Sequence, residues 1–136
     1  MEDRVCQKVS GGNDMESKVS IWMGLFEGEE ELHKYTNIEY TENGDSIPSE
    51  FESEFSLGYY DRALVEKKFV KKTSDVETLL KNFSYNESFQ KSNLIIAKEY
   101  NSVILIYDFE KAVDIKDKTI DFIGEITYQK IVEDRW

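Results

Sequence analysis

Apolar side chains alternate with small or polar ones at residues 18–24, and this period of two predicts a β-strand. Val19, Ile21 and Met23 form the apolar side, so Trp22 and Gly24 fall on the other side. A large aromatic side chain there is either covered by another part of the fold or left at the surface for a partner. We expect Trp22 to be buried beneath a helix that covers this second face of the sheet.

The residues after this strand predict a helix over 27–35. Gly28 is an acceptable N-cap, and the acidic residues that follow it lie at the positive end of the helix dipole. The spacing of Leu32 and Tyr35 places both side chains toward the core.

A turn and a second short helix follow. Residues 37–40 are expected to be extended, and the Asn43–Gly44 pair predicts a tight turn. Pro48 presets the backbone for a helix over 48–57. One face of this helix carries Phe51 and Phe55, and a parallel row carries Glu50 and Glu54.

A strand and two more helices are predicted for the middle of the chain. Residues 64–70 are rich in aromatic and β-branched side chains, which favours a strand. Ser74 with Glu77 has the spacing of a capping box, and Val76, Leu79, Leu80 and Phe83 follow at helical spacing. Ser84 with Glu87 repeats that spacing and predicts a longer helix to about residue 98.

The last third of the chain is predicted to be a β-hairpin. Residues 102–109 are apolar at consecutive positions, as in a central strand covered on both faces. The partner strand lies within 118–129, with Ile120, Phe122, Ile126 and Tyr128 expected on one face.

Together these elements predict an α+β fold. We expect one domain over 18–136, in which four short to medium helices pack on a mainly antiparallel sheet with 102–109 as its apolar central strand. Residues 1–17 are polar and predict a mobile leader, which contains the single cysteine, Cys6. No apolar run approaches the length of a membrane span and no secretion signal is recognisable, so we expect a cytoplasmic protein.

The formal net charge of −11 is unevenly distributed. Residues 1–66 hold 16 acidic and 5 basic side chains, whereas 67–136 hold 12 of each. Residues 27–66 contain twelve carboxylates and only two basic side chains, Lys34 and Arg62. This balance argues against binding a nucleic-acid backbone, which requires arrayed lysine and arginine, and favours a basic protein partner.

Candidate catalytic groups are scarce. The single histidine, His33, lies within the predicted 27–35 helix without a second histidine or a nucleophile motif nearby, and we interpret it as a surface residue. Adjacent carboxylates at 29–31 point in different directions along a helix, so we predict no metal site and no cofactor. We expect a binding protein rather than an enzyme. A carboxylate-based hydrolase is the less favoured alternative.

The predicted partner surface combines acids with tyrosines. Tyr59, Tyr60 and Asp61 directly follow the helix that carries Glu50 and Glu54. Tyrosine suits interfaces because its ring is apolar while its hydroxyl still forms hydrogen bonds. We therefore predict these five residues at the centre of a partner-binding surface. The alternative that both tyrosines only close the edge of the core remains open.

Six segments occur along the chain in this order: "VSIWMGLFEGEEELHKY", "IEYTENGDSIPSEFESEF", "YYD", "SYNESF", "NSVILIYDFE" and "FIGEITY". Taken together, they resemble the immunity protein 22 family of bacterial polymorphic toxin systems. The resemblance covers about residues 18–128 and includes Trp22 with Gly24, the turn into a helix at Pro48, and the late "FIG" strand at 122–124. Gly28 departs from the serine expected at that helix start. The resemblance implies an α+β, non-enzymatic antidote that binds and neutralises a cognate toxin domain, often a nuclease. An acidic regulatory or scaffolding domain for another basic protein is the alternative.

Overall fold

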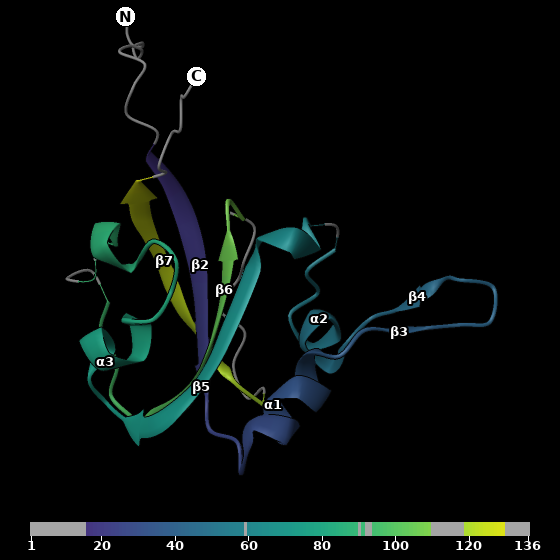
Figure 1. Ribbon diagram of the computed structural model, residues 1–136, viewed down its shortest axis with the longest axis horizontal. Helices are drawn as coiled ribbons and strands as arrows, with labels where there is room; N and C mark the ends of the chain where they lie inside the picture. Colours follow the sequence, from purple (N-terminus) through teal and green to yellow (C-terminus); the bar gives the residue numbers. More distant parts are fainter. Residues whose placement is uncertain (1–15, 59, 90, 92–93, 110–118, 130–136) are drawn as a thin grey trace, which may run out of the picture.

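An antiparallel sheet with helices on both faces forms the centre of the molecule (Figure 1). The computed structural model describes residues 16–58, 60–89, 91, 94–109 and 119–129. The sheet has four strands in the order β5-β6-β2-β7, and each neighbouring pair is antiparallel. This confirms the predicted α+β class with a mainly antiparallel sheet. The strands are β2 (Glu16–Gly24), β5 (Val65–Thr73), β6 (Tyr100–Tyr107) and β7 (Asp121–Gln129).

Three α-helices and a small hairpin complete the described fold. The helices are α1 (Glu29–Thr36), α2 (Glu50–Glu54) and α3 (Val76–Leu80). The hairpin consists of β3 (Glu39–Tyr40) and β4 (Ser46–Ile47), which pair with each other in a sheet of their own. Two short 3-10 turns, η1 (Arg62–Leu64) and η2 (Asn86–Ser88), lie in the connections.

Trp22 faces the layer formed by α1 and α2 and is fully buried. Leu32 and Tyr35 of α1, together with Phe51 and Phe55 around α2, join it in one apolar cluster, as their helical spacing predicted. The opposite face of the sheet carries the second cluster, where Val19, Ile21 and Met23 meet α3 and the residues around η2. Figure 1 shows α3 on one side of the sheet and α1 with α2 on the other.

The predicted hairpin between 102–109 and 118–129 is wrong. The strand from the first segment, β6, pairs with β2 and β5, and the strand from the second, β7, pairs only with β2 among the described strands. The first strand of the chain therefore lies between the two expected partners. Alternation of side chains fixes which face a residue takes but does not specify which strand lies beside it.

The predicted single face of β7 is also wrong. Ile120 and Phe122 pack in the cluster of Trp22, whereas Ile126 and Tyr128 pack in the cluster on the opposite face. The cause is a bulge in the pairing with β2, because the register shifts between Ile21 and Trp22. Gly124 lies at this bulge with a φ of 146°, a conformation that glycine adopts without strain. One extra residue reverses the faces of all the residues beyond it.

The predicted fourth helix, over 84–98, is absent from the described residues of that segment. The described residues of the segment include η2 and no α-helix, and residues 94–99 are not helical. Ser84 does not act as an N-cap, because its backbone N–H and its hydroxyl donate to the two carboxylate oxygens of Glu66, at 3.1 and 2.6 Å. A contact with β5 thus replaces the local cap that the sequence suggested.

Helix α3 forms, but its N-cap is not the predicted Ser74. Asp75 takes that position and accepts hydrogen bonds from the backbone N–H and the hydroxyl of Thr78, at 3.2 and 2.5 Å. The helix ends at Leu80, and Phe83 is buried beyond its end. Asp75 and Ser74 are both acceptable N-caps by residue type, so the sequence pattern alone does not distinguish between them.

Gly24 allows a close approach between the end of β2 and the residue before β7. A Cβ atom at this position would lie 2.3 Å from Cγ2 of Ile120, which is too short for any real contact. Ile120 is 2% exposed and belongs to the cluster of Trp22. Packing therefore requires glycine at this position. This gives a physical reason why Gly24 follows Trp22 on the same face of β2.

Candidate functional site

The acidic residues gather on the side of the sheet that α1 and α2 cover. We define the acidic face as α1, the β3–β4 hairpin, α2, Gly58 and residues 60–62. These elements follow one another in the chain and lie together in Figure 1. Eight exposed carboxylates belong to the face, and Glu27 precedes it directly. The eight are Glu29, Glu30, Glu31, Glu39, Glu42, Asp45, Glu50 and Asp61.

Both basic side chains of the acidic face are already held in ion pairs. Lys34 lies 3.7 Å from Glu31 on the same helix, and the Nε of Arg62 lies 3.0 Å from Glu52. His33 is exposed and lies 3.6 Å from Glu29. The lysine and arginine charges are therefore matched by two of the acids, and most of the exposed carboxylates remain as net negative charge.

The five residues predicted to bind a partner have different environments. Glu50 and Asp61 are exposed, and Asp61 also accepts a hydrogen bond of 2.9 Å from the backbone N–H of Ala63. Glu54 and Tyr60 are half-buried and form internal hydrogen bonds. Tyr59 lies outside the described residues. Of the predicted set, the structure thus places two side chains fully at the surface.

Glu54 joins α1 to the residues before β7. It accepts a hydrogen bond of 2.6 Å from the hydroxyl of Tyr35, and bonds of 3.1 and 2.9 Å from the backbone N–H and hydroxyl of Thr119. Glu50 and Glu54 therefore differ in environment, because Glu50 is exposed and Glu54 forms internal hydrogen bonds. A substitution of Glu54 would disturb the packing as well as the surface charge.

Glu52, which the sequence analysis did not single out, organises the region between α2 and η1. It is 8% exposed and forms a capping box with Ser49, whose N–H donates to it over 3.2 Å. The hydroxyl of Tyr60 donates to it over 2.5 Å, and Arg62 donates from Nε and Nη2 over 3.0 and 3.2 Å. Burial would raise the pKa of Glu52, but the bonds from Arg62 and Tyr60 lower it below its usual value. The Ser49-x-x-Glu52 spacing was the signal that could have identified it.

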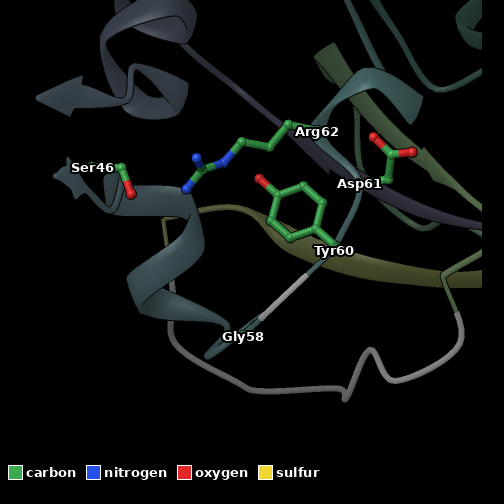
Figure 2. A pocket seen from close by; sticks show the side chains of 5 residues that line it. All are labelled: Ser46, Gly58, Tyr60, Asp61 and Arg62. Atoms are coloured by element: carbon green, nitrogen blue, oxygen red, sulfur yellow. The ribbon is translucent and has the colours of Figure 1, made fainter. Parts of the chain in front are cut away.

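A hollow of about 290 Å³ lies beside this cluster. Its lining combines Ser46 of β4 with Gly58, Tyr60, Asp61 and Arg62. In Figure 2 the Arg62 side chain runs beside the hydroxyl end of Tyr60 toward Ser46, and the Asp61 carboxylate points away from both. Gly58 has a φ of 67°, which helps the chain to turn between α2 and η1. The hollow is thus an open, polar depression at the base of the hairpin.

A second hollow adjoins β3 and α1. It has a volume of about 650 Å³ and is shallow, with Glu39 of β3 at one edge. Four residues, three of them in α1 and one just beyond its end, complete the lining. They are Glu30, His33, Lys34 and Asn37. Each strand of the hairpin therefore borders one of the two hollows, β4 the first and β3 the second.

Tyrosine hydroxyls, rather than lysines, hold several of the carboxylates inside the fold. Tyr35 donates to Glu54 and Tyr60 to Glu52 on the acidic face, and Tyr107 donates to Glu66 over 2.5 Å elsewhere. Burial, together with the adjacent carboxylate, raises the pKa of each of these tyrosines well above its usual value. All three hydroxyls therefore keep their protons at neutral pH and act as donors.

The described residues contain no group of three or more histidine, cysteine, aspartate or glutamate side chains that could hold a metal ion. Among the same residues, every helix falls short of the length and apolar character that a bilayer-spanning segment needs.

Comparison with known proteins gives one match. No curated protein and no solved structure matches the chain. The family model described as Immunity protein 22 matches residues 19–129, which include the whole sheet except residues 16–18 of β2, all three α-helices and the acidic face. The chain therefore belongs to the Immunity protein 22 family.

Proposed function

We propose that this protein is an antitoxin that binds a cognate bacterial toxin domain and neutralises it through the acidic face. Membership of an immunity protein family supports the antitoxin role. The observation that carries the choice of surface is the gathering of exposed carboxylates on α1, the β3–β4 hairpin and α2, with both local basic side chains already paired.

The chemistry of the partner follows from this charge. A nuclease presents a cationic groove for phosphates, and a dense carboxylate surface can occupy such a groove in place of the substrate. We propose that the partner toxin is basic at its contact surface and that Glu50, Glu54, Tyr59, Tyr60 and Asp61 lie within the interface. The exposed Glu50 and Asp61 would contact the toxin directly. Glu54 and Tyr60 would act mainly by holding α1, α2 and η1 in place.

Co-expression tests the antitoxin role. The toxin domain encoded beside this chain in the genome is expressed in a host cell with and without it. The full chain is expected to restore growth and to form a complex with the domain during purification. Continued growth arrest together with no complex would contradict the proposal.

Charge reversal tests the surface. Glu50→Lys is expected to slow association with the toxin domain by about tenfold at low salt and to weaken the salt dependence, because a steering charge is replaced by a repelling one. The matched control is Glu87→Lys, since Glu87 is exposed in η2 beside the other apolar cluster. Both variants should unfold at the same temperature as the wild type. Equal association rates for the two variants would exclude Glu50 from the interface.

A further inference from the structure

The β3–β4 hairpin projects from the body of the protein. Figure 1 shows it extending away from α1 and α2, with its turn at the far end. Each residue from 39 to 48 is exposed, whereas the flanking α1 and α2 both carry buried side chains. At about 3.3 Å per extended residue, the stretch from Glu39 to Thr41 spans about 7 Å, and the turn at 42–44 lies beyond it. The hairpin is therefore long enough to enter a cleft on another molecule.

Two large apolar side chains on this hairpin are exposed. Tyr40 is 64% exposed and Ile47 is 43% exposed. Tyr40 pairs with Ser46 and Glu39 pairs with Ile47, so the two apolar side chains lie on opposite faces of the hairpin. An isolated two-stranded hairpin is only marginally stable in water. An element that carries one apolar side chain on each face presents apolar contact area to both walls of a cleft that encloses it.

The tip of the hairpin is nevertheless ordered by its own hydrogen bonds. The Thr41 hydroxyl accepts from the backbone N–H groups of Asn43 and Asp45, both at 3.2 Å. Two backbone bonds close the turn, from Thr41 to Asp45 at 2.8 Å and from Gly44 to Thr41 at 3.0 Å. Gly44 has a φ of 89°, which this turn requires. A preformed tip loses little conformational entropy on binding, which favours affinity.

The charge of the hairpin selects its partner. Residues 37–50 contain Glu39, Glu42, Asp45 and Glu50 and no lysine, arginine or histidine. One hollow adjoins Glu39 and the other adjoins Ser46, so loops of a partner could seat on both sides while the hairpin enters between them. We propose that the β3–β4 hairpin inserts into the cationic groove of the toxin domain, with Tyr40 and Ile47 contacting the two walls of the groove and the carboxylates facing its basic residues.

This inference rests on the proposed function, and its test uses the toxin domain that the full chain binds in the co-expression experiment. The variant is Tyr40→Ala combined with Ile47→Ser in the full chain. The matched control is Ile95→Ser, because Ile95 is 89% exposed and lies outside the acidic face. The equilibrium dissociation constant is measured for each by titration calorimetry. The unfolding temperature of each variant is expected to equal that of the wild type, since all three side chains are exposed.

We expect the double variant to bind the toxin domain at least about thirtyfold more weakly, the effect of removing a central aromatic anchor, while Ile95→Ser binds as the wild type does. A second variant, Glu42→Lys with Asp45→Lys, is expected to associate at least about tenfold more slowly at low salt than Glu87→Lys, because repulsion replaces steering. Wild-type affinity in both hairpin variants would overturn the insertion and leave the antitoxin role standing. No binding by the wild-type chain would overturn both.

Discussion

Trp22→Ala is expected to lower the free energy of unfolding by about 3–5 kcal/mol, the range for truncating a fully buried large aromatic side chain. Trp22 is 0% exposed and packs edge-on against Phe51, with ring centroids 5.0 Å apart and an interplanar angle of 88°. Phe55 and Phe122 lie at 6.0 and 5.3 Å by the same measure. The substitution would leave a cavity between the sheet and α2 that rigid aromatic neighbours cannot fill.

Hydrogen bonding does not contribute to this expected loss. The indole N–H of Trp22 has no hydrogen-bond partner among the described residues, so the cost arises from lost packing and from the cavity. Chemical denaturation followed by circular dichroism measures the change, with Leu25→Ala as the control, because Leu25 is 52% exposed. The control is expected to change the free energy of unfolding by less than about 0.5 kcal/mol. A loss of that small size for Trp22→Ala would contradict the burial described above.

Glu52→Gln is expected to lower the free energy of unfolding by about 2–3 kcal/mol, although it removes only a charge from a protein that carries a large excess of negative charge. The carboxylate accepts from Ser49, Tyr60 and Arg62, and the neutral amide can no longer serve all of these donors. Glu50→Gln is the matched control. Glu50 is the exposed neighbour on the same helix, and its substitution should have almost no effect.

The pH dependence identifies the cause of the Glu52 effect. The pKa of Glu52 is lower in the folded protein than in the unfolded chain, where it is about 4.3, so its charge stabilises the fold above that pH. The contribution is lost as the pH falls through the folded value. The difference between wild type and Glu52→Gln should therefore be constant near neutral pH and should shrink below about pH 4. A difference that does not change with pH would indicate a loss of shape rather than of charge.

Local signals in the sequence located most of the elements because their causes are local. Gly28, Leu32 and Tyr35 correctly indicated the start and the buried side of α1. The turn at Gly44 followed from residue type alone. The strand predicted over 64–70 is confirmed by β5, which continues to Thr73.

The errors arose where a distant contact overrode a local signal. Ser84 had the spacing of a helix cap, but Glu66 of β5 takes both of its donors. The bulge at Gly124 reversed the faces of β7, and only the pairing with β2 reveals it. The position of β2 between β6 and β7 is likewise a property of the whole sheet.

The candidate site was predicted in part for the same reason. Charge density along the sequence marked the consecutive elements that carry the exposed carboxylates of the acidic face, and their role in binding a partner stays a prediction. It did not separate exposed acids such as Glu50 from the internal acids Glu52 and Glu54, because that distinction depends on tyrosines and an arginine brought in by the fold. The charge density also did not indicate that the β3–β4 hairpin projects from the rest of the fold with its residues exposed.

Amide hydrogen exchange of the chain, free and bound to its toxin domain, tests the use of the acidic face most directly. The account predicts slower exchange in the complex over residues 29–62, with the largest change at 39–47, and unchanged exchange over 76–89 on the opposite side of the sheet. Slower exchange confined to 76–89, with the β3–β4 hairpin exchanging as it does in the free protein, would contradict it.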